Sequence, residues 1–191
     1  MLGKTRVDDQ FIANWHPQYG ESEHDELAYQ CLVKRVRMEV SELSTISRST
    51  FEEIYDWKAA RARRHVQWDD FQMYESALRN ALTAPDDQKV EVLVGLPGIG
   101  MPVASTILHF IYPTSFPIVD FRTVETLQHF RCLDKSRSRH FFRDTAAGYQ
   151  VFRRAMLKIA RENVKWSLRE IDRALFAYHK RAMKLKKKHR S

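Results

Sequence analysis

One stretch, residues 91–127, constrains the fold more than any other part of the chain. Within it, residues 95–100 contain three glycines and one proline, and apolar segments lie on both sides. Because glycine and proline interrupt regular helices, this pattern predicts a helix, a tight hairpin and a second helix over residues 85–112. Pro102 suits the first turn of the second helix, because its missing N–H would have no intrahelical partner there.

The hairpin also predicts a place for an anion. Gly98 and Gly100 have no Cβ, so the backbone can turn sharply and a phosphate can approach it closely. The unpaired N–H groups at the start of the second helix then face that phosphate, with the positive end of the helix dipole behind them. We therefore expect the partner to carry phosphate groups.

A second motif follows the hairpin. Leu96-Pro97-Gly98-Ile99-Gly100 is followed by Ala104 and, after a proline-containing loop, by Ile118-Val119-Asp120. This combination resembles the signature of the helix-hairpin-helix DNA glycosylases (the HhH-GPD superfamily), in which a hairpin of L-P-G-V-G type precedes an essential aspartate at the same spacing. The hairpin alone also occurs in DNA-binding proteins that are not enzymes, so the aspartate makes the resemblance specific.

The likeness covers residues 51–130 and, more weakly, 167–180. It implies an all-α, two-lobed glycosylase-like fold, with residues 1–191 forming a single domain. It also implies double-stranded DNA as the partner, and an enzyme of base-excision repair that hydrolyses the bond between a modified base and its sugar to leave an abasic site.

The resemblance gives Asp120 the catalytic role. Breaking an N-glycosidic bond builds positive charge on the sugar, and a fixed carboxylate stabilises that charge and can orient the attacking water. The local sequence also allows a plain helix N-cap at Asp120. The hairpin at the family spacing favours catalysis, and one carboxylate can do both.

Two departures from the family pattern limit the chemistry. Members that also cut the DNA backbone carry a lysine where this chain has Pro102, and proline cannot form a Schiff base, so we expect a monofunctional hydrolase. Asp120 is followed by Phe121-Arg122 in place of the family's common Thr-His. With only Cys31 and Cys132, no four-cysteine iron–sulfur cluster can form, and we expect two reduced, mostly packed thiols.

Further site residues are predicted around these motifs. An extruded base needs an aromatic pocket, for which Tyr55, Trp57 and Trp68 are candidates, with Lys58 as a polar donor; packed core aromatics and an ordinary surface lysine are the alternative interpretations. The residues expected to contact DNA are Leu96, Gly98, Ile99, Gly100 and Arg122. By resemblance, backbone carbonyls of Val94, Leu96 and Ile99 would hold a structural Na⁺ or K⁺ at the hairpin.

Composition agrees with a soluble protein that binds a polyanion. The chain has a net charge of +8 and a pI near 9.6, which favours nucleic acid. Residues 92–119 carry no Asp, Glu, Lys or Arg, but a membrane span needs ~20 helical residues and the prolines leave only about ten. We expect a monomer that does not bind membranes, located in the cytoplasm with the nucleoid if bacterial and in the nucleus if eukaryotic.

Apolar spacing predicts helices along the whole chain, and no segment alternates with period two. Residues 1–23 are expected to form an irregular arm with at most one short helix. The helix signals are an apolar face (Tyr29, Leu32, Val36, Val40, Leu43), an S-x-x-E capping box at Ser49–Glu52, a cap at Asp69 or Asp70, a start at Pro85, an apolar face from Tyr149 to Ile159, and a second capping box at Ser167–Glu170.

Two basic segments keep several interpretations. The loop 131–139 is either a solvated connection or a phosphate contact. The tail 180–191 is a frayed helix end, a nuclear-localisation tract or, as the hairpin favours, a DNA-tracking tail. Two further functions stay open beside the glycosylase: a non-catalytic helix-hairpin-helix DNA-binding protein, and a helical scaffold that binds protein. The sequence does not identify the base.

Overall fold

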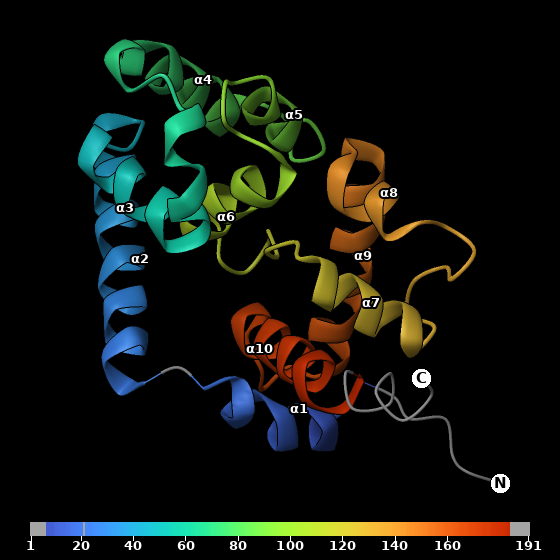
Figure 1. Cartoon of the computed structure of the whole chain (residues 1–191). Coiled ribbons are helices and arrows are strands. Elements are labelled where there is room, and N and C mark those ends of the chain that lie inside the picture. The colour runs from blue at the N-terminus through green and yellow to red at the C-terminus, as the bar shows by residue number, and fades with distance from the viewer. Residues whose placement is uncertain (1–6, 21, 184–191) are drawn as a thin grey trace, which may run out of the picture. The chain divides into compact units, whose positions relative to one another are not determined.

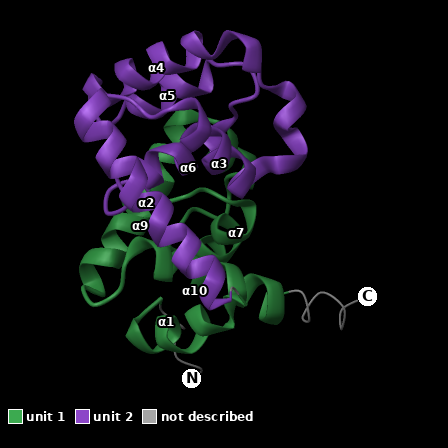
Figure 2. Ribbon diagram, turned by 90° about the vertical axis from the view of Figure 1, so that its left-hand side faces the viewer, with its two compact units in different colours: residues 1–20, 117–191 green, residues 21–116 purple. Residues whose placement is uncertain are grey.

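The computed structural model describes residues 7–20 and 22–183, and the regular elements in these ranges are all helical (Figure 1). This confirms the predicted all-α fold class. The chain divides into two compact units, one formed by Met1–Gly20 with Pro117–Ser191 and the other by Glu21–Phe116 (Figure 2). Among the described residues, no helix is both long and apolar enough to span a bilayer. Most of the basic tail, residues 184–191, lies outside the described residues.

The unit Glu21–Phe116 is built around one buried helix. Its elements are α2 (Glu23–Leu43), α3 (Arg48–Ala59), the 3₁₀ turns η2 (Ala60–His65) and η3 (Trp68–Asp70), α4 (Phe71–Thr83), α5 (Lys89–Val94) and α6 (Met101–Ile111). Helix α6 packs against α2, α3 and α5, and residues 103–110 are all buried. A helix that is apolar on every side has to be buried, which confirms α6 as a core helix.

Polar side chains fix α6 within this core. His109 is fully buried, and its two ring nitrogens lie 2.7 Å from the Tyr29 hydroxyl and 2.9 Å from the Phe116 carbonyl. A neutral imidazole can donate from one nitrogen and accept at the other. His109 therefore ties α6 to α2 and to the end of the unit.

Lys89 holds the junction between α4 and α5. Its ammonium donates to the carbonyls of Ala81, Leu82 and Ala84 at 3.1, 3.0 and 2.7 Å, although the residue is buried. These carbonyls end α4, where the last turn has no further N–H groups to bond. A buried cation at the negative end of the helix therefore replaces the missing donors.

The unit of Met1–Gly20 and Pro117–Ser191 surrounds α10. Its elements are α1 (Asp9–Trp15), the 3₁₀ turn η1 (His16–Tyr19), α7 (Phe121–His129), α8 (Arg139–Asp144), α9 (Ala146–Glu162), α10 (Leu168–Tyr178) and the π-helical turn η4 (His179–Met183). Helix α10 packs against α1, η1 and α7. The described part of the predicted N-terminal arm contains the short helix α1, whose Phe11 is buried against Phe130 and Tyr178, with ring centroids 5.1 and 5.4 Å apart.

Several predicted helix starts are confirmed and others are wrong. Ser167 and Glu170 form the predicted capping box of α10. The box predicted at Ser49 is wrong, because the N-cap of α3 is Ser47, whose backbone N–H and hydroxyl are both bound by the Glu39 carboxylate. Asp70 precedes α4 but its side chain makes no capping bond, because Asp70 is also the last residue of the 3₁₀ turn η3.

Other local expectations also differ. Helix α5 begins at Lys89, because residues 85–88 form a turn in which the Pro85 carbonyl accepts from the Gln88 N–H. Leu43 is exposed at the end of α2, whose buried face stops at Val36. Both cysteines are free as expected, but they are exposed and not packed.

Replacing Lys89 by Met should destabilise the fold by about 2–4 kcal/mol, because three buried carbonyls lose their donor while the volume is kept. Lys158→Met is the matched control: Lys158 is mostly exposed and its ammonium lies 3.8 Å from the Glu162 carboxylate on the same helix, so the change should stay below about 0.5 kcal/mol. Urea unfolding would measure both. Equal stabilities of the two variants would contradict the role assigned to Lys89.

Candidate functional site

The residues predicted to act on DNA belong to both units. The hairpin and the predicted pocket residues lie in Glu21–Phe116, whereas Asp120 and Arg122 lie in the other unit.

The hairpin joins α5 to α6 by a tight turn. The Ile99 N–H donates to the Leu96 carbonyl at 3.0 Å, and Gly98 has a φ of 75°. An L side chain is strained at this φ. A Cβ on Gly98 would also lie 2.7 Å from the His65 carbonyl oxygen, so the missing side chain leaves room for the protein's own backbone. The left-handed φ confirms the sharp turn predicted at Gly98, and the approach of a phosphate to its backbone stays a prediction.

Two tyrosine hydroxyls support the hairpin from inside the unit. The Tyr74 hydroxyl donates to the Pro97 carbonyl at 2.8 Å and accepts from the Gln67 N–H at 2.9 Å. The Tyr55 hydroxyl lies 3.1 Å from the carbonyls of both Gly98 and Ala62. Burial raises the pKa of the Tyr55 phenol, which keeps it protonated as a donor. These hydrogen bonds to the carbonyls of the turn therefore hold it in place.

The hydrogen-bond donors of the hairpin are backbone N–H groups at the start of α6. Gly100 is the N-cap in extended conformation, and Pro102 lies in the first turn as predicted. No hydrogen bond from the backbone N–H groups of Gly100 and Met101 is recorded within the described part of the chain, as is usual for a first turn. These groups can bind an anion. The Ile99 side chain is buried, so only its backbone could contact DNA.

The carbonyls of Val94, Leu96 and Ile99 are neutral oxygen ligands, which suit a monovalent cation. Leu96 already accepts one hydrogen bond, from Ile99, and retains a second lone pair. The tyrosines occupy the carbonyls of Pro97 and Gly98 instead. The Na⁺ or K⁺ site on these three carbonyls stays a prediction. Among the described residues, no group of three or more His, Cys, Asp or Glu side chains could hold a metal ion.

The predicted pocket residues differ in their surroundings. Tyr55 is fully buried between Phe51 and Trp68, so its ring cannot receive a base, and the pocket role predicted for it does not fit. Trp68 donates from its indole N–H to the Arg63 carbonyl at 2.9 Å and lies under the Arg63 guanidinium. Trp57 and Lys58 are half-buried on α3 and stay candidates.

Asp120 is the N-cap of α7, as one of its two interpretations predicted. Its Oδ1 accepts from the Arg122 N–H at 2.9 Å, and its own N–H donates to the Thr123 hydroxyl at 3.3 Å in a capping box. The side chain is 22% exposed. Capping thus fixes one carboxylate oxygen and leaves the group accessible.

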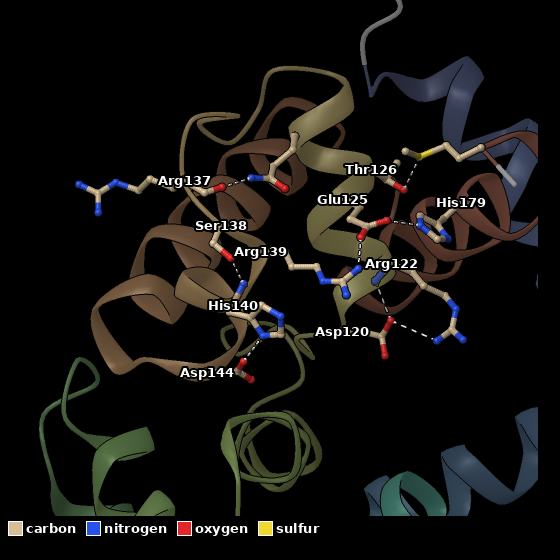
Figure 3. Close-up of polar contacts among 12 residues, drawn as sticks. Asp120, Arg122, Glu125, Thr126, Arg137, Ser138, Arg139, His140, Asp144 and His179 are labelled. Atoms are coloured by element: carbon tan, nitrogen blue, oxygen red, sulfur yellow. Dashed lines mark hydrogen bonds and ion pairs between the residues drawn. The ribbon is translucent and has the colours of Figure 1, made fainter. Parts of the chain in front are cut away.

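Arg122 faces the same carboxylate. Its Nη1 lies 3.5 Å from Asp120 Oδ1 (Figure 3), and its guanidinium carbon lies 4.3 Å from the Phe121 ring centroid and 4.8 Å from that of Phe176. The Nε of Arg122 is buried and has no hydrogen-bond partner among residues 7–20 and 22–183. The structure therefore surrounds Arg122 with partners from its own unit.

Sequence reasoning missed a charged group on the next turn of α7. Glu125 binds Arg139 and lies 2.7 Å from Nε2 of His179 (Figure 3). Burial raises the pKa of the Glu125 carboxyl, but the hydrogen bonds from His179 and Arg139 outweigh it and hold that pKa below its ordinary value. Glu125 and His179 are 54 residues apart, so no local pattern could have paired them.

The basic loop between α7 and α8 is held in place. The Gln128 side-chain amide donates to the carbonyls of Asp134 and Arg137 at 3.0 and 2.8 Å, and the Arg137 guanidinium lies over the Phe141 ring. Ser138 then caps α8. Both interpretations of this loop, solvated connection and phosphate contact, stay open.

Comparisons with family models, with curated proteins and with solved structures gave no match to this chain. The likeness to the helix-hairpin-helix glycosylases therefore rests on the motif residues themselves.

The two hairpin glycines should respond differently to alanine. Gly98→Ala should lose at least about 2 kcal/mol of stability, because of its φ and the His65 carbonyl. Gly100→Ala is the matched control for folding: its Cβ would make only an ordinary 3.8 Å contact with Pro102, so stability should change by less than about 0.5 kcal/mol.

The control also tests the DNA contact. If a phosphate binds at the start of α6, Gly100→Ala should weaken duplex binding roughly tenfold while the protein stays folded, because the methyl group stands in the way of one charge-assisted hydrogen bond. Fluorescence anisotropy with a labelled duplex measures this. Unchanged affinity would show that no phosphate approaches this backbone.

Proposed function

We propose that this protein is a monofunctional DNA glycosylase, which removes a modified base from double-stranded DNA by hydrolysis and leaves an abasic site. The observation that carries the proposal is the combination of the hairpin with Asp120, an accessible carboxylate fixed at a helix N-terminus. Membership of the helix-hairpin-helix glycosylase superfamily is part of the proposal.

The hairpin would bind the DNA backbone. The N–H groups at the start of α6 and the dipole of that helix favour a phosphate oxygen. A Na⁺ or K⁺ ion on the carbonyls of Val94, Leu96 and Ile99 would add positive charge there when bound. The net charge of +8 supports this contact over a longer range, because it attracts a polyanion and makes binding sensitive to salt.

Asp120 would act on the sugar. As the base leaves, positive charge develops at the anomeric carbon, and a carboxylate held in a fixed orientation stabilises this charge without having to reorganise. The same group can accept a hydrogen bond from the attacking water. Because Pro102 takes the place of the lyase lysine, the expected product is an abasic strand that breaks only on treatment with alkali.

Replacing Asp120 by Asn tests the catalytic assignment. Asparagine is as good an N-cap as aspartate, so folding should be kept, but the negative charge is lost. Base release should fall by about 10²- to 10³-fold, whereas duplex affinity should stay the same or rise. Duplexes carrying a panel of modified bases, incubated with protein and then with alkali, would report the strand breaks.

Asp8→Asn is the matched control, because Asp8 caps α1 through the Phe11 N–H in the same unit. It should leave base release unchanged. A normal rate in Asp120→Asn would refute the catalytic role. If the wild-type protein binds the duplexes but releases no base from the panel, the non-catalytic DNA-binding protein becomes the better description.

A further inference from the structure

Arg122 lies in a stack that alternates cations and rings. Its guanidinium is between Phe121 and Phe176. On one side Phe121 is also covered by Arg139, at 5.4 Å, and on the other Phe176 is backed by the Tyr19 ring, at 5.1 Å. Cations within about 6 Å of a ring centroid are attracted to its face. The two rings therefore hold the Arg122 guanidinium in place.

This placement is poorly suited to the phosphate contact expected from the sequence. Arginine usually binds phosphate through two parallel N–H groups of a free fork. Among the described residues, the buried Nε of Arg122 has no hydrogen-bond partner, the guanidinium carbon lies over the rings of Phe121 and Phe176, and Nη1 is directed to Asp120. The side chain is only 28% exposed.

The same contacts orient the Asp120 carboxylate. Both bonds from Arg122, one from its backbone N–H and one from its guanidinium, reach the same oxygen, Oδ1. The Thr123 backbone N–H completes the capping box at the same carboxylate, and Oδ2 points away from Arg122 (Figure 3). Arg122 and the helix start therefore hold the carboxylate in one orientation.

We propose that Arg122, clamped between Phe121 and Phe176, is a positioning residue that sets the orientation of Asp120 for base release and does not bind the DNA backbone. This inference rests on the proposed glycosylase function. Its physical basis is that a shift of about 1 Å in a reacting group can lower a rate by about 10²-fold. The ring clamp reduces the freedom of Arg122 and thus of the carboxylate it contacts.

The test separates the rate of base release from DNA affinity. Arg122→Met should slow single-turnover base release by about 10- to 100-fold and change the Kd for the duplex by less than about twofold. Phe176→Leu leaves both charged groups in place but removes one face of the clamp, so it should lower the rate by less than Arg122→Met does. Arg154→Met, at an exposed arginine of α9, is the control for loss of one positive charge and should change neither quantity.

Three results would overturn the inference. A weaker duplex affinity in Arg122→Met that accounts for the whole rate loss would make Arg122 a backbone contact. An unchanged or faster rate would show that the ion pair does not help the carboxylate. Rapid solvent exchange of the Arg122 Nε–H in an NMR spectrum of the wild-type protein would show that the clamp is absent, because a buried N–H should exchange slowly.

These results are distinct from failure of the proposed function. If the wild-type protein releases no base, the glycosylase proposal falls, and the role of Arg122 in base release falls with it. If the wild-type protein is active and Arg122→Met is equally active, only the positioning role is refuted.

Discussion

The hairpin depends on two buried hydroxyl groups. Tyr55 on α3 and Tyr74 on α4 bind the carbonyls of Gly98 and Pro97, so the helices of this unit determine the shape of the turn. The two carbonyls are bonded within the protein, so they do not compete for the backbone N–H groups at the start of α6. Under the proposed function, these N–H groups would bind a phosphate. The His65 carbonyl also lies where a Gly98 side chain would be. The glycine-rich turn is therefore shaped by contacts within its own unit, and its binding to an anion is part of the proposed function.

Under the proposed function, Asp120 would serve the fold and the chemistry together. A carboxylate that caps a helix is fixed by the helix itself. It is therefore already oriented in the folded protein, and substrate binding does not have to order it. Arg122 adds a second constraint on the same oxygen, and the rings of Phe121 and Phe176 constrain Arg122 in turn. If the chain is a glycosylase as proposed, Phe121-Arg122 in place of the family's common Thr-His would give the carboxylate a different support.

The parts that were predictable from sequence are those set by neighbours in the chain. The turn at Gly98, Pro102 in the first turn of α6, the capping box at Ser167 and the N-cap at Asp120 all follow from local patterns. The start of α3 was misplaced because Glu39, from another helix, selects Ser47 as the cap. Likewise, the clamp by Phe176 joins side chains 54 positions apart along the chain, which no local pattern reveals.

The central claim is that Asp120 stabilises positive charge on the sugar, and this can be measured without knowing which base is removed. A duplex containing a pyrrolidine abasic nucleotide carries a cation at the position of the anomeric carbon, whereas a tetrahydrofuran abasic nucleotide has the same shape without the charge. The wild-type protein should bind the pyrrolidine duplex at least about 100-fold more tightly, as for other transition-state analogues, and Asp120→Asn should abolish the difference. Equal affinities in the wild-type protein would contradict the account.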